Sequence, residues 1–98
     1  MKMFIYQTSQ EEFEAIHSGN QTCYVAPTRN NKRYKVGDAL ILVQSHFNPQ
    51  MLVKKISHTQ DAMLMLSLPT SEILSLHNFA PEQEAEIKGR VFQKLQSL

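Results

Sequence analysis

The residues best suited to bind a ligand lie between positions 22 and 35 of the chain. They are Thr22, Arg29, Lys32, Arg33, Tyr34 and Lys35. Arginine and lysine can neutralise phosphate groups, and a tyrosine ring can stack on an exposed base. This combination predicts a surface that binds RNA or a nucleotide-like ligand. The alternative is a solvated loop, because short basic clusters are common on the surfaces of soluble proteins.

Thr22 itself allows two interpretations. Its hydroxyl group could face a ligand pocket, or the residue could stand in a strand because its branched shape suits a pleated sheet. We expect no metal or other cofactor, because the four histidines show no spacing of a metal site and Cys23 is the single cysteine of the chain. A histidine near Thr22 in the fold stays open as a catalytic partner.

Length and composition predict one ordered domain over residues 1–98. The chain is 42% hydrophobic and 19% charged, which is typical of globular proteins. The net charge of +1 says little about partners, because the distribution of charge decides what a surface binds. No apolar run approaches the roughly 20 residues of a membrane span, and a lone cysteine forms no internal disulfide. The simplest compartment is therefore the cytosol.

The local patterns predict an α+β fold with about five strands. The expected strands cover residues 1–6, 21–25, 39–44, 51–57 and 62–68. A helix should begin after Ser9, an N-cap with Glu12 three residues later, and end at Gly19. Gly37 should take the positive φ of a tight turn. Short strands with frequent turns and few crossover helices favour a compact barrel over a parallel sheet.

From position 69 onward the patterns become helical. Thr70 or Ser71 could cap a helix over residues 72–79, and Pro81 should start a second one. The second helix is amphipathic, with an apolar stripe made of Ile87, Val91, Phe92 and Leu95. We expect residues 1–68 to form the barrel and 69–98 a helical segment. The stripe should pack on the barrel, and docking on a second copy in a weak homodimer is the alternative.

Two segments resemble the ASCH domain, a family of small PUA-like β-barrels associated with RNA. Residues 13–22, "FEAIHSGNQT", are similar to its helix and Ser-Gly-x-x-Thr turn. Residues 33–44, "RYKVGDALILVQ", are similar to its aromatic-x-x-Gly-Asp-x-Leu turn and strand. The resemblance covers less than half of the chain. It implies a PUA-like barrel with Thr22 at a ligand pocket and an RNA or nucleotide-like ligand.

Some members of that family hydrolyse acetylated cytidine with the threonine as nucleophile. The resemblance carries over Thr22 alone, because Gln21 and Ala26 occupy the positions of the family's lysine and arginine. Glutamine cannot take a proton from threonine, so we assign no catalytic residue. Arg29 could replace the missing arginine after a two-residue shift. Three functions follow as hypotheses: an RNA- or nucleotide-binding domain, an altered nucleoside amidohydrolase, and a protein-interaction module that uses the C-terminal helix.

Overall fold

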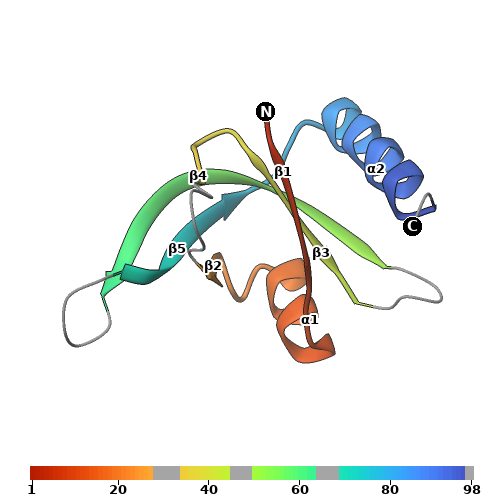
Figure 1. Ribbon diagram of the computed structural model, residues 1–98. Coiled ribbons are helices and arrows are strands. Elements are labelled where there is room, and N and C mark those ends of the chain that lie inside the picture. The colour runs from red at the N-terminus through yellow and green to blue at the C-terminus, as the bar shows by residue number, and fades with distance from the viewer. Residues whose placement is uncertain (28–33, 45–49, 64–68, 97–98) are drawn as a thin grey trace.

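The computed structural model describes residues 1–27, 34–44, 50–63 and 69–96 of the chain. Its elements follow the order β1 (Met3–Gln7), α1 (Gln10–Ser18), β2 (Cys23–Pro27), β3 (Ala39–Val43), β4 (Met51–Met63), β5 (Pro69–His77) and α2 (Pro81–Gln96) (Figure 1). The predicted α+β class is therefore confirmed. Within the described residues, no helix is long and apolar enough to cross a membrane.

The five strands form one mixed sheet in the order β1-β3-β4-β5-β2. β1 runs parallel to β3, and the other three pairs are antiparallel. The sheet is strongly curved (Figure 1), but β1 and β2 remain its two edges, with no pairing between them in the described residues. The described residues therefore form an open sheet, and the predicted barrel is not confirmed. A barrel needs its edge strands to reach hydrogen-bonding distance, whereas here β1 and β2 are joined through side chains.

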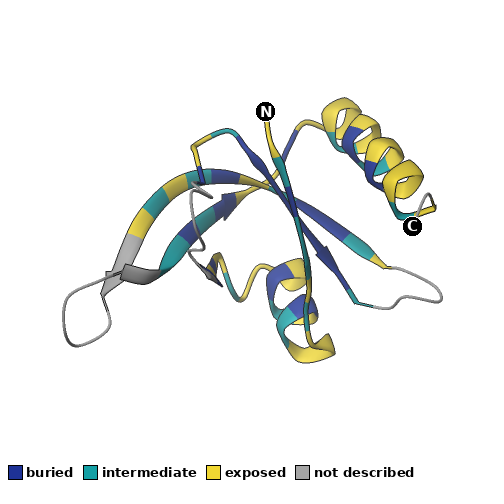
Figure 2. Cartoon of the chain, viewed as in Figure 1, coloured by how far each residue is buried: buried dark blue, intermediate teal, exposed yellow. Residues whose placement is uncertain are grey.

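Side chains alternate between the two faces of the sheet and build two apolar clusters. All five residues of β3 are buried, which is typical of a strand covered on both sides (Figure 2). Leu40 and Leu42 belong to the cluster on the concave face, where Phe13 and Ile16 of α1 also pack. Ala39, Ile41 and Val43 belong to the other cluster, which also contains Ile87 and Val91 of α2. The sheet thus lies between the two helices.

Local signals set the limits of α1 as predicted. Ser9 is the N-cap, and its Oγ accepts a hydrogen bond from the Glu12 amide at 3.2 Å. Gly19 ends the helix with φ of 86°, and its amide donates to the Ile16 carbonyl. Phe13 and Ile16 are buried against the sheet. The cap residues and the i, i+3 apolar pair therefore predicted this helix correctly.

The helix predicted over residues 72–79 is wrong, because β5 covers Pro69–His77. β5 pairs with β4 on one side and with β2 on the other, and its buried residues Leu74 and Leu76 recur with the period of two that marks a strand. Pairing on both sides thus outweighs local helix propensity. Of the strand expected over residues 62–68, positions 64–68 lie outside the described residues.

α2 begins at Pro81 as predicted and lays most of its stripe on the sheet. Ile87 and Val91 are buried, and Leu95 packs against the same cluster. Phe92 instead keeps 46% of its surface exposed. At 100° per residue, it lies about 140° around the helix from Ile87, which takes it off the buried face. The predicted stripe is therefore correct except for Phe92.

Candidate functional site

The carboxylate of Asp38 holds two chain segments together at one end of the sheet. Asp38 is buried, with 6% of its surface exposed. Its Oδ1 accepts a hydrogen bond from the Lys2 amide at 3.0 Å, and its Oδ2 accepts one from the Lys35 amide at 3.2 Å. Gly37 adopts φ of 97°, the positive value predicted for this turn. One side chain thus brings two exposed lysine residues, far apart in sequence, next to each other.

A row of backbone hydrogen bonds connects this turn to the neighbourhood of Thr22. The Gly37 amide donates to the Ile56 carbonyl at 2.8 Å, and the Ile56 amide donates to the Asp38 carbonyl at 2.9 Å. Ile56 is the register partner of Leu76, whose amide donates to the Thr22 carbonyl at 2.8 Å. The structure thus places Thr22 and the Lys35 turn at the same end of the sheet. Three strand spacings, about 14 Å along the curved surface, separate them.

Two further lysines lie at this end, on opposite faces of β4. Lys54 is the register partner of the concave-face residue Leu40, and its Nζ donates to Asn78 Oδ1 at 2.6 Å. Lys55 is exposed on the other face, where its Nζ lies 6.0 Å from the centre of the Phe79 ring. Successive strand residues point to opposite sides, so Lys55 extends the positive surface over the face that carries α2.

Tyr34 lies in the core, with 4% of its surface exposed. Its ring centroid is 4.6 Å from that of Phe4, and its hydroxyl group is hydrogen-bonded to the hydroxyl of Tyr6. Burial raises the pKa of Tyr34, and the hydrogen bond to Tyr6 and the charge of Glu72 raise it further. The neutral phenol is therefore the stable form. The ring packs inside the protein rather than at the surface, where stacking on a ligand base would require it.

Thr22 is exposed, and in the described part of the chain no base is hydrogen-bonded to its hydroxyl group. Its Oγ1 contacts Cys23 Sγ at 4.0 Å. The neighbouring Gln21 side chain donates from Nε2 to the Cys23 carbonyl at 2.8 Å and is thus occupied with the backbone. A threonine without a proton acceptor is a weak nucleophile. This environment suits a hydrogen-bonding contact better than covalent chemistry.

The remaining predicted ligand residues, Arg29, Lys32 and Arg33, lie outside the described residues. Sequence reasoning missed Lys2, because only the hydrogen bond to Asp38 places it beside Lys35. In the parts of the chain that the structure describes, no three His, Cys, Asp or Glu residues gather as a metal site would require.

No protein family, curated protein or solved structure was found to match this chain. The likeness to the ASCH domain therefore stays a prediction, based on the residues that carry it. A functional proposal therefore depends on the lysines around Asp38 and on the position of Thr22 at the same end of the sheet.

Proposed function

We propose that this protein is a PUA-like domain of the ASCH type that binds RNA or a nucleotide-like ligand at the end of the sheet that carries Lys35. The proposal is carried by the Asp38 carboxylate, which ties the amides of Lys2 and Lys35 to the same buried group. Both lysine residues are exposed, so their positive charges are accessible to a ligand. Lys55 adds a third charge from β4, where it is the register partner of Ala39, the residue after Asp38.

The order of the elements also supports this proposal. A helix follows the first strand, the Gly37–Asp38 turn leads into the buried strand β3, and Thr22 stands just before β2. These are the places of the corresponding features in the ASCH domain that the sequence resembles. Arg29, Lys32 and Arg33 precede Tyr34 and Lys35 directly in the chain, so they would enlarge the positive surface.

The same geometry defines the kind of recognition that we expect. Lysine and arginine contacts to phosphates are independent of sequence and weaken with salt. With Tyr34 in the core, base stacking on that ring plays no part. Thr22 would provide a hydroxyl contact at the far side of the same end of the sheet. We therefore expect electrostatic binding to single-stranded RNA with little preference for sequence.

Fluorescence anisotropy with a labelled single-stranded RNA at several salt concentrations tests this function. Affinity should fall steeply as salt is added. The R33A/K35A double variant should make the negative slope of log K against log salt less steep by about 1.4, because each lost phosphate contact removes about 0.7. The matched control, K88A/R90A, removes the same charge from the exposed side of α2 and should keep the slope. Salt-independent binding, or an equal loss in both variants, would contradict the proposal.

A further inference from the structure

The strand β1 leaves part of its backbone open at the edge of the sheet. The Ala39 amide donates to the Lys2 carbonyl at 2.9 Å, and the Thr8 amide donates to the Val43 carbonyl at 3.0 Å. In a parallel pair, alternate residues bond to the neighbouring strand, so the even-numbered residues of β1 face β3. The backbone groups of Met3 and Ile5 consequently point to the other side, where the sheet order places no further strand of the described chain.

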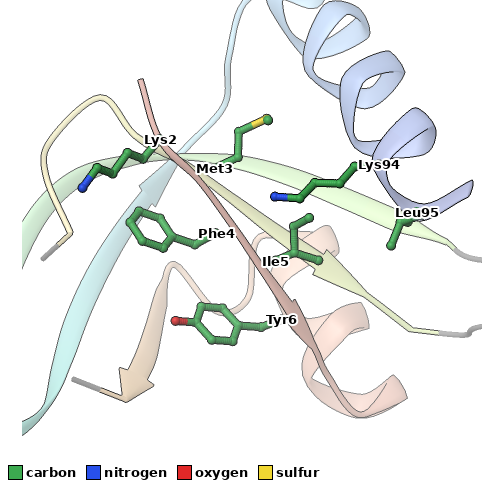
Figure 3. Close-up of a pocket in the computed structure, with 7 residues that line it drawn as sticks. All are labelled: Lys2, Met3, Phe4, Ile5, Tyr6, Lys94 and Leu95. Atoms are coloured by element: carbon green, nitrogen blue, oxygen red, sulfur yellow. The ribbon is translucent and has the colours of Figure 1, made fainter. Parts of the chain in front are cut away.

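A groove of about 510 Å³ follows this open edge (Figure 3). It is lined by residues 2–6 of β1 together with Lys94 and Leu95 from the last turn of α2. Phe4 belongs to the concave-face side of β1, whereas Ile5 packs with the cluster under α2. Residues from both faces can line one groove only where it runs along the strand edge. The groove therefore gives a ligand access to the unpaired amide and carbonyl groups of β1.

The charge of the groove indicates the kind of ligand. Lys2 and Lys94 both line it, and among the described residues that line it there is no carboxylate. Lys35 lies close to the Lys2 end through their shared Asp38 contact. A second copy of this chain paired strand to strand would bring another Lys2 and Lys94 into the same interface, and like charges oppose such pairing. A ligand with negative charge fits this edge better.

The backbone groups restrict the ligand further. Met3 and Ile5 each present one N–H and one C=O, two residues or about 6.6 Å apart along the strand. A phosphate chain offers acceptors only, whereas an extended peptide offers donors and acceptors at the same spacing. We propose that the β1 edge binds an extended acidic peptide of a partner protein, which adds to the sheet as a sixth strand. Its backbone pairs with Met3 and Ile5, and its carboxylates approach Lys2 and Lys94.

A capped heptapeptide of valine and glutamate, with glutamates at both odd and even positions so that carboxylates lie on both faces of the extended chain, is a direct probe of this site. We expect the 98-residue chain to bind this peptide. It should bind neither the same peptide with lysine in place of glutamate nor a peptide methylated on alternate backbone nitrogens. Amide exchange measured by NMR should slow at Met3 and Ile5 when the peptide is added. The amides of Phe4 and Tyr6, which face β3, should change little. Binding without protection at Met3 and Ile5 would overturn the proposal.

Charge variants with a matched control give an independent test that preserves the fold. K2Q/K94Q should weaken binding of the acidic peptide about tenfold, as expected for the loss of two exposed charge pairs. K88Q/R90Q makes the same change of net charge on α2 outside the groove and should change binding less than about twofold. Equal effects of the two double variants would show a non-specific charge effect and overturn the proposal.

The Ile5→Pro variant tests the backbone contact itself. Proline at position 5 removes an N–H that points away from β3, and an edge strand tolerates such a loss. Peptide binding should be lost in this variant, whereas the control variant Ile5→Val should retain it. Unchanged binding by a folded Ile5→Pro protein contradicts strand addition. A dimer formed without peptide, with Met3 and Ile5 protected, would assign the edge to a second copy. Protection of these amides by RNA instead of peptide would assign it to nucleic acid.

Discussion

Tyr6 and Tyr24 belong to opposite edge strands of the sheet, yet their ring centroids lie 5.9 Å apart. The curvature of the sheet brings them together across the concave face, where Tyr6 also bonds to the hydroxyl of Tyr34. Aromatic side chains thus close the space that strand pairing closes in a barrel. This cluster stabilises the curvature of the sheet.

Stability should fall at alkaline pH because of this tyrosine cluster. The pKa of Tyr34 in the folded protein is raised above its ordinary value of 10.0, first by burial, and that of Tyr24 is raised by burial and by Glu12. The unfolded chain therefore loses these protons at lower pH than the folded one, so stability is complete below about pH 10 and declines as pH rises above it. Urea unfolding at several pH values measures this decline.

The Tyr34→Phe variant separates the contribution of one hydroxyl group. It keeps the ring against Phe4 but removes the bond to Tyr6, and we expect a loss of about 1 kcal/mol at neutral pH. The alkaline decline in stability should also become shallower than in the original protein. A variant whose stability depends on pH as steeply as before would show that Tyr34 does not titrate differently on unfolding.

Asp38→Asn should destabilise the protein by about 2–3 kcal/mol, measured as the free energy of urea unfolding. The carboxylate accepts from two backbone amides, and hydrogen bonds to a charged acceptor are among the stronger ones. An asparagine offers one carbonyl oxygen and turns its NH2 group toward the second amide. The matched control is Glu84→Gln, which removes an exposed ion pair with Lys88 and should cost at most about 0.5 kcal/mol. Similar losses in both variants would refute a special role for Asp38.

Alanine at two glycines should have opposite effects on stability. Gly37 has φ of 97°, and no atom lies within 4 Å of an added Cβ, so Gly37→Ala should cost about 1 kcal/mol or more through backbone strain alone. Gly89 lies inside α2, also with open space around it, and Gly89→Ala should stabilise the protein by about 1 kcal/mol. Thermal unfolding of both variants checks the signs. A stabilising Gly37→Ala would rule out the strained turn.

Local sequence signals predicted those elements whose contacts lie within a few residues. The α1 helix depends on the Ser9 cap and the Gly19 end, and the turn before β3 depends on Gly37. The start of α2 at Pro81 follows from the same kind of signal. β5 was mistaken for a helix because its identity depends on pairing with β4 and β2, which no local pattern of a short segment contains.

The candidate site also has one part that the sequence predicts and another that depends on the tertiary structure. The amino-acid types by themselves determined that the chain could present basic residues and a threonine to a ligand, because charge and hydrogen-bonding capacity belong to each side chain. Only the tertiary structure decided that Lys2 joins Lys35, that Tyr34 is buried, and that the β1 edge stays open beside Lys94. These relations arise from strand order and sheet curvature, which depend on contacts between residues far apart in the chain.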